Sequence, residues 1–140
     1  MKAKVVYYTK SGNTKKVASA IGEALNCQVS TVDTPISEKV EVLFLGASVY
    51  KFGIDKKVLQ FIDGLDAKKI GKVVIFSTSA MADSGYPKLV KKLKDKGIAV
   101  SEAHYYCKGA FMMMNKNHPN QADVNEAKAF AKQIVASQGK

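Results

Sequence analysis

The sequence predicts a single α/β domain in which a doubly wound, five-stranded parallel sheet lies between two layers of helices. Short apolar, β-branched runs alternate with amphipathic stretches along the chain. Two of these runs are almost continuously hydrophobic, which is typical of strands covered on both faces. The 140 residues are 46% hydrophobic and 24% charged and contain no linker, repeat or low-complexity segment. Residues 1–140 are therefore expected to form one globular domain.

Five runs have the composition of strands, because each is rich in β-branched or aromatic residues and ends at polar or glycine-containing segments. The third and fourth runs are the most uniformly apolar, and the fifth is less so. The predicted strands are Lys4 to Tyr8, Val29 to Val32, Val40 to Val49, Lys72 to Thr78 and Ile98 to Cys107.

Four stretches between these runs have helical periodicity. In Asn13 to Leu25 the apolar residues fall on one stripe, and Asp55 to Leu65 has the same pattern. A third helix is predicted to begin around Pro87 and to stop at Gly97. A fourth opens at Asn120, where an aspartate three residues later completes a capping box.

The connection between the second and third strands has no clear helix. Only about seven residues, Asp33 to Lys39, join the two runs, close to the minimum for a parallel crossover. A stunted helix or a 3₁₀ turn around Ile36 is predicted there.

The formal net charge of +10 comes from 22 basic residues, and all of them are lysines. Arginine supplies the planar fork that specific nucleic-acid readers use on guanine. Its absence argues against sequence-specific nucleic-acid binding, although loose attraction to polyanions stays open. Most of the lysines are expected to form a solvated surface.

The two cysteines, Cys27 and Cys107, do not belong to a CxxC or His/Cys ligand pattern. They are expected to be structural thiols in a reducing compartment, and no metal site is predicted. The apolar run near the N-terminus is too short for a signal peptide or a membrane span. The expected location is the cytoplasm.

The segment after the first predicted strand, Thr9-Lys10-Ser11-Gly12-Asn13-Thr14, leads directly into a helix. A helix start carries partial positive charge and amides without intrahelical partners, and it therefore favours an anion. Gly12 lets the backbone approach closely, and the hydroxyls of the segment add donors. The alternative is an ordinary turn in which Ser11 or Asn13 caps the helix.

Two related phosphate motifs are missing. The chain has neither the GxGxxG of dinucleotide-binding folds nor the GxxxxGK[ST] of P-loop NTPases. A loop of hydroxyl groups suits a terminal monophosphate dianion, so the predicted ligand is a mononucleotide-like phosphate.

The segment VVYYTKSGNTKKVA resembles the FMN-phosphate loop of flavodoxins, whose pattern is [ST]-x-[ST]-G-x-T after the first strand. FLGASVYKFG and HPNQADVNEAKAFAKQI are also similar to segments of short-chain flavodoxin-like proteins. This resemblance implies the strand order 2-1-3-4-5 and the cofactor FMN.

By the same resemblance, the flavin ring lies between the segments that follow the third and fourth strands. The third-strand residues are Ser48, Val49, Tyr50, Lys51, Phe52 and Gly53. Tyr50 and Phe52 are candidates for stacking, or else they pack on the next helix, and Gly53 is the candidate for a peptide that reorients on flavin reduction. The fourth-strand residues are Ser77, Thr78, Ser79, Ala80, Gly85 and Tyr86, with Tyr86 as a possible second stacking residue.

The resemblance implies an electron carrier that passes single electrons between partner proteins, without catalytic residues of its own. The positive charge suggests acidic partners and a less reducing couple for the fully reduced flavin than in acidic flavodoxins. A monomer is expected. Two alternatives stay open: a flavodoxin-like oxidoreductase of the protoporphyrinogen oxidase or quinone reductase type, and a binding module of this fold that has lost tight FMN binding.

Overall fold

The computed structural model describes residues 2–9, 12–50, 53–79, 86–108 and 119–138. For residues 48–50, 53, 79, 108 and 138 only the backbone is described. Lys10, Ser11, Lys51, Phe52, Ala80 and Gly85 from the predicted site lie outside the described residues.

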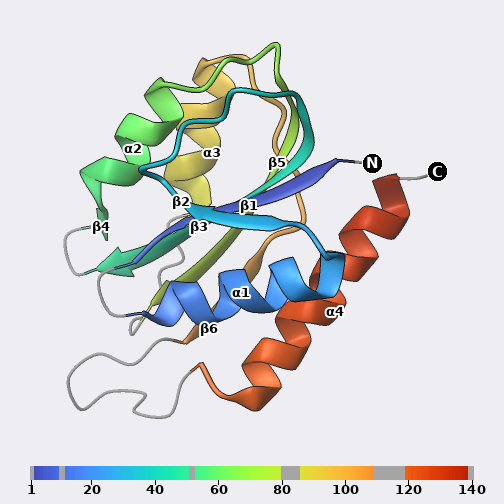
Figure 1. The fold of residues 1–140 in the computed structure, drawn as a ribbon. Coiled ribbons are helices and arrows are strands. Elements are labelled where there is room, and N and C mark those ends of the chain that lie inside the picture. The colour runs from blue at the N-terminus through green and yellow to red at the C-terminus, as the bar shows by residue number, and fades with distance from the viewer. Residues whose placement is uncertain (1, 10–11, 51–52, 80–85, 109–118, 139–140) are drawn as a thin grey trace.

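A five-stranded parallel sheet crosses the molecule in the order β2-β1-β3-β5-β6, with a short strand β4 paired antiparallel to β3 (Figure 1). Numbered along the chain without β4, this is the predicted order 2-1-3-4-5, which is confirmed. The strands are β1 (Ala3–Tyr8), β2 (Gln28–Thr31), β3 (Val40–Tyr50), β4 (Gly53–Ile54), β5 (Ile70–Ser79) and β6 (Tyr105–Lys108).

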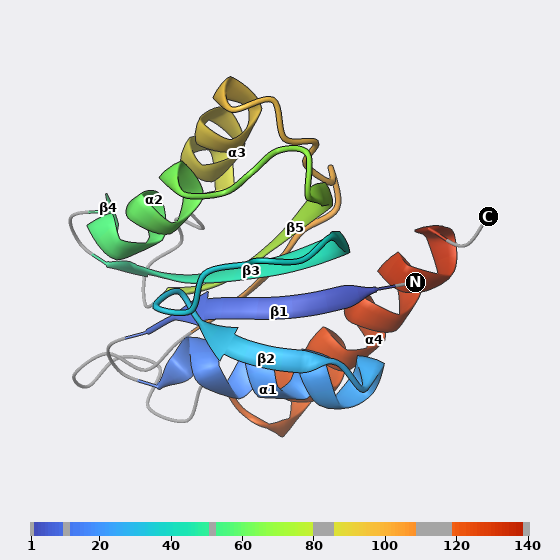
Figure 2. The same cartoon turned by 45° about the horizontal axis from the view of Figure 1, so that its top comes forward.

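Helices cover both faces of the sheet, as Figures 1 and 2 show. On one face α1 (Asn13–Leu25) and α4 (Gln121–Gln138) pack against a core that includes Val5, Phe44 and Phe76. On the other face α2 (Lys56–Asp63) and α3 (Tyr86–Asp95) cover a core that includes Val6, Leu45 and Ile75. Successive strand residues point to opposite faces, and this explains why the middle of a central strand is apolar at consecutive positions, as at Leu43, Phe44 and Leu45 of β3.

The predicted helix starts agree with the structure in detail. The Asp55 side chain accepts a hydrogen bond from the amide of Lys57 at 2.9 Å and caps α2. Asn120 and Asp123 exchange side-chain to backbone hydrogen bonds of 2.9 Å in both directions. The capping box at the start of α4 is therefore confirmed.

The prediction of a stunted helix around Ile36 is wrong. Residues 32–39 contain a turn, closed by a 3.1 Å bond from the amide of Thr34 to the carbonyl of Thr31, and otherwise no regular structure. The reason is the distance to be spanned, because the segment must return along the length of β1, which is about 20 Å. Eight extended residues span about 26 Å, whereas the same residues in a helix would rise only about 12 Å.

The fifth predicted strand, Ile98 to Cys107, is interrupted. Val100 forms a single bridge with Val73, and regular pairing resumes at Tyr105 beside Phe76. These two pairings leave two residues between them on β5 but four on the other strand. The extra residues cannot pair, so only Tyr105–Lys108 is a regular strand.

Candidate functional site

The carboxyl ends of β1, β3, β5 and β6 meet at one edge of the sheet. The register aligns Tyr8 with Ala47, Ala47 with Ser77, and Ser79 with Lys108. Each predicted site segment follows one of the first three of these strands, so the topology brings them to the same edge. In open α/β sheets this edge, where the winding reverses, is where ligands bind.

Gly12 is the N-cap residue of α1, and it has the left-handed conformation with φ 89°. Its amide donates a hydrogen bond of 3.0 Å to the side-chain oxygen of Thr9. Gly12 has no side chain that could cap the helix, and because it occupies the N-cap position, this residue is neither Ser11 nor Asn13. A Cβ built on Gly12 would meet no atom of the described residues beyond its chain neighbours within 4 Å. The start of α1 is thus an open cradle whose backbone conformation favours glycine.

Thr14 lies in the first turn of α1 and is completely buried. Its hydroxyl is 2.8 Å from that of Thr78, near the end of β5. Its methyl group lies over Gly46 of β3, where a Cβ would be 3.0 Å from Thr14 Cγ2 and would collide with the ring of Phe76. Thr14, Thr78 and Gly46 therefore fix the start of α1 against the two central strands.

The backbone of β3 continues through Ser48 and Val49 to Tyr50 and pairs with β4. Val49 lies opposite Ile54, and Tyr50 opposite Gly53. This antiparallel pair is not predictable from the sequence pattern, because two residues are too few to produce a strand signal. The pair places Tyr50 and Gly53 side by side at the carboxyl edge.

Ser77 and Thr78 on β5 are both about 1% exposed. Thr78 faces Thr14, whereas the Ser77 hydroxyl has no hydrogen-bond partner among the described residues. Ser79 follows in register with Val49. The structure thus brings Thr9, Gly12, Asn13 and Thr14 to the edge that the ends of β3 and β5 share.

Tyr86 begins α3, and its ring stacks on His104 with 3.8 Å between ring centroids and 10° between planes. Its hydroxyl donates to the carbonyl oxygen of Ser101 at 2.8 Å. One ring face is therefore occupied by a partner that the sequence did not indicate. A stacking role on a flavin remains a prediction for Tyr86.

Tyr8 and Lys57 form a second contact that the sequence did not reveal. The amine of Lys57 lies 5.8 Å from the centroid of the Tyr8 ring, within the range of a cation–π interaction. Tyr8 is the last residue of β1 and Lys57 is in the first turn of α2. The contact places a positive charge beside the carboxyl edge.

Burial shifts the pKa values of several groups. It raises the pKa of the Cys107 thiol to about 12, with the carboxylate of Asp123 adding to the effect. It also raises the pKa of the Tyr105 phenol and of the half-buried Cys27 thiol, and it lowers that of His104. The thiols are therefore held protonated at neutral pH, as expected of structural cysteines.

Within the described ranges, no group of three or more histidine, cysteine or acidic side chains is arranged to hold a metal. No described helix is long and apolar enough to cross a bilayer.

Comparisons with known proteins agree with this geometry. The family model described as a flavodoxin domain matches residues 4–129. An uncharacterized protein of Methanocaldococcus jannaschii is 32% identical over 150 residues, covering 96% of this chain and 99% of that protein.

Among solved structures, a flavodoxin from the domain Archaea superposes with a TM-score of 0.81 at 20% identity, covering 100% of both chains. Rubredoxin oxygen:oxidoreductase from Desulfovibrio gigas superposes with a TM-score of 0.73 at 18% identity, over 97% of this chain and 35% of that one. These two likenesses show the same fold, as a whole protein and as part of a larger one. With the family match extending over most of its length, the chain belongs to the flavodoxin domain family.

Proposed function

We propose that this protein binds FMN at the carboxyl edge of its sheet and carries single electrons between partner proteins. The observation that supports this most directly is the start of α1. Gly12 is in the left-handed conformation, it has no side chain of its own to cap the helix, and no atom of the described residues lies within 4 Å of a Cβ built on it. A phosphate fits this cradle because the first amides of a helix and its dipole favour an anion.

The residues that would hold the phosphate are those of segment 9–14. Thr9 fixes the amide of Gly12, while Thr14 anchors the first turn to β5. Because Thr14 is fully buried, its proposed part is to position the backbone of the turn. The hydroxyls of Thr9 and Ser11 and the side chain of Asn13 are the proposed polar contacts, with Lys10 as a further source of positive charge.

The proposed ring site lies between residues 48–53 and 77–86, whose flanking strands end side by side. Tyr50 and Phe52 are proposed to supply an apolar wall, and the backbone of Ser79 and Ala80 to contact the polar rim of the ring. When bound, FMN would supply the redox chemistry, and the protein would orient it and set the electrostatic field.

The test is a comparison of FMN with riboflavin, which has the same ring and no phosphate. Purified protein is titrated into each flavin, and quenching of flavin fluorescence is followed. We expect FMN to bind at least about 100-fold more tightly, because several charge-assisted hydrogen bonds to the phosphate are lost with riboflavin. Equal affinity for the two flavins, or no binding of either, would refute the proposal.

A further inference from the structure

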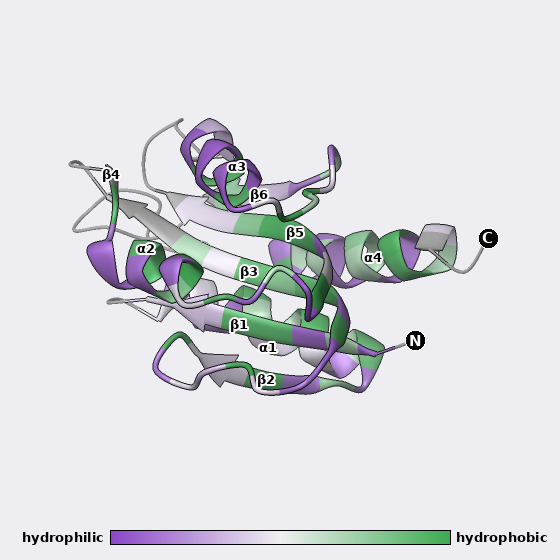
Figure 3. Cartoon of the chain, turned by 90° about the horizontal axis from the view of Figure 1, so that it is seen from above, coloured by the Kyte–Doolittle hydropathy of each residue, from purple (hydrophilic) through white to green (hydrophobic). Residues whose placement is uncertain are grey.

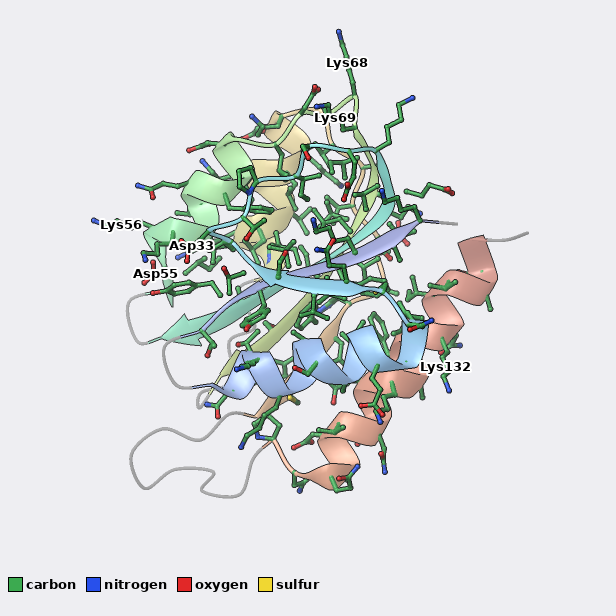
Figure 4. All side chains as sticks on the ribbon, viewed as in Figure 1. Asp33, Asp55, Lys56, Lys68, Lys69 and Lys132 are labelled. Atoms are coloured by element: carbon green, nitrogen blue, oxygen red, sulfur yellow. The ribbon has the colours of Figure 1, made fainter. Side chains whose placement is uncertain are left out.

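In the part of the chain that the structure describes, five exposed lysines lie around the carboxyl edge of the sheet. Together they are called the lysine rim: Lys15, Lys16, Lys56, Lys57 and Lys88. Lys15 and Lys16 are at the start of α1 on one side of the sheet, and the other three are in the first turns of α2 and α3 on the opposite side. The rim therefore flanks the candidate site from both faces. Figure 4 shows Lys56 projecting outward beside the start of α2.

These positions are unfavourable for lysine. A helix start carries partial positive charge, so acidic residues are stabilising there and basic residues are not. None of α1, α2 and α3 has an acidic residue in its first turn. Three helices that begin at the same edge thus share a feature that local helix stability does not explain.

Most lysines of the rim also carry a charge that no neighbouring carboxylate of the described residues neutralises. Within the described part of the chain, Lys15, Lys16, Lys56 and Lys88 form no ion pair, whereas Lys91, Lys92 and Lys128 are paired with carboxylates. Three carboxylates of the described residues lie near the same edge. Asp55 and Asp123 serve as helix caps, and Asp33 is exposed in the turn after β2. Hydrophilic residues predominate on the outer surfaces of α2 and α3 (Figure 3).

We propose that the lysine rim is the docking surface for an acidic redox protein, whose carboxylates face the rim while the two redox centres approach across the carboxyl edge. This inference rests on the proposed function, because it assigns the partner of that same site. A single small anion cannot contact lysines on both sides of the sheet, whereas a protein surface carrying several carboxylates can. The absence of arginine from the chain makes a nucleic acid a poorer fit.

The first experiment uses FMN-loaded protein that has been fully reduced and is then mixed with an excess of ferricyanide in a stopped-flow instrument. Two ferricyanide ions each accept one electron from one anionic reduced flavin, which releases a proton to solvent. The rim variant is Lys56→Glu with Lys88→Glu. The control is Lys68→Glu with Lys132→Glu, which changes the net charge equally at exposed positions far from the edge (Figure 4).

At low ionic strength we expect the rim variant to react with ferricyanide about tenfold more slowly than the wild type, since local charge steers association. The cationic oxidant hexaammineruthenium(III) should react faster with the rim variant. The control should change either rate less than about twofold, because solvent screens remote charges. Equal effects of the two variants would overturn the proposal, since net charge alone would then explain them.

The Tm of the rim variant separates a docking role of these lysines from a merely structural one. Glutamate in the first turn of α2 and α3 suits the helix dipole, so the rim variant should have a higher Tm while its reaction with ferricyanide slows. A lower Tm together with a slower reaction would indicate damage to the fold.

The second experiment needs no flavin. A short oligoglutamate peptide is titrated into ¹⁵N-labelled protein, and amide shifts are followed by NMR. Shifts concentrated at residues 13–16, 56–57 and 88 support the docking surface, and equal shifts around Lys68 and Lys132 overturn it. If the protein takes up no FMN, the proposed function fails at the loading step, and this titration still decides on the rim.

Discussion

The side-chain hydroxyls of Thr14 and Thr78 lie 2.8 Å apart in the interior, and they join the first turn of α1 to the end of β5. The two residues are 64 positions apart in the chain. Thr14 is the last residue of the segment proposed to bind the phosphate, and Thr78 lies near the start of a segment proposed to contact the ring. A buried contact therefore couples the two ends of the candidate site.

Replacing Thr78 with valine tests this coupling. Valine has nearly the same shape but no hydroxyl, so the buried hydrogen bond between residues 14 and 78 is lost, which costs about 0.5–1.5 kcal/mol of unfolding free energy. The start of α1 should also become less well fixed. We expect FMN affinity to fall several-fold more than riboflavin affinity, as measured by fluorescence titration, with stability measured by urea denaturation.

Two controls accompany this variant. Thr78→Ser keeps the hydroxyl and should restore most of the discrimination between the flavins. Ser77→Ala, on the adjacent position of β5, removes a buried hydroxyl without a described partner and should leave stability unchanged or raise it. If Thr78→Val and Thr78→Ser behave alike, the hydrogen bond does not couple the two segments.

Gly46 is predicted to tolerate no side chain. A Cβ there would collide with the Phe76 ring and approach Thr14 Cγ2 to 3.0 Å, and overpacking of this kind costs about 1–3 kcal/mol. Gly46→Ala should lower the urea midpoint and weaken FMN binding. At Gly64, an added Cβ would lie 3.6 Å from the nearest atom, so Gly64→Ala is the matched control. Equal losses of stability and FMN binding from both substitutions would mean that the close contact between Gly46 and the start of α1 has no special role.

Cys107 should make the protein less stable in alkali. Its pKa is raised from an ordinary value of 9.0 to about 12 by burial, so above pH 9 the thiol ionises in the unfolded chain but not in the folded one. The unfolded state then binds fewer protons, and unfolding free energy falls by up to about 1.4 kcal/mol per pH unit between pH 9 and pH 12.

Cys107→Ala should flatten this dependence between pH 9 and pH 10. Tyr105, whose pKa burial raises from an ordinary value of 10.0, begins to add a loss of its own in this range, and both proteins retain that tyrosine. The measurement is urea denaturation of both proteins at pH 8, 9 and 10. The difference between pH values is informative, because the smaller side chain also lowers stability at every pH. Parallel pH profiles for wild type and variant would contradict the assignment.

The charge around the site should also raise the potential of the bound flavin. Positive charge stabilises the anionic, fully reduced form, so Lys56→Glu with Lys88→Glu should lower the potential at which that form appears. The expected shift is on the order of 10 mV, since solvent screens exposed charges. Spectroelectrochemistry of the wild type, the rim variant and the Lys68→Glu/Lys132→Glu control measures it. No difference between the two variants would show that these lysines are too distant to act.

The alternation of apolar runs and amphipathic stretches was enough to predict a doubly wound parallel sheet and all four helices, because burial on both faces of a parallel sheet leaves a strong pattern. The strand order itself was predicted from the resemblance to flavodoxins. The cap of α4 was predictable for a local reason, since Asn120 and Asp123 bond each other. By contrast, the pairing of Thr14 with Thr78 and the stacking of Tyr86 on His104 depend on residues far apart in the sequence.

The crossover from β2 to β3 shows where local reasoning fails. The shortness of the link suggested a stunted helix or a 3₁₀ turn around Ile36, but the distance to be covered requires an extended chain. The extended segment still buries that residue in part against the core beneath α2 and α3. The distance between the two strands that it joins therefore decides the conformation of this segment.

That extended crossover has a consequence for how the molecule opens. β2 is an outer strand of only four residues, with α1 on one face and an irregular segment in place of a helix on the other. Its hydroxyl at Ser30 is buried without a described partner. In native-state hydrogen exchange, the amides of β2 should exchange through a local opening well before those of β3 and β5. Detachment of this strand, with the remaining four parallel strands still paired, is a partially unfolded form that the fold permits.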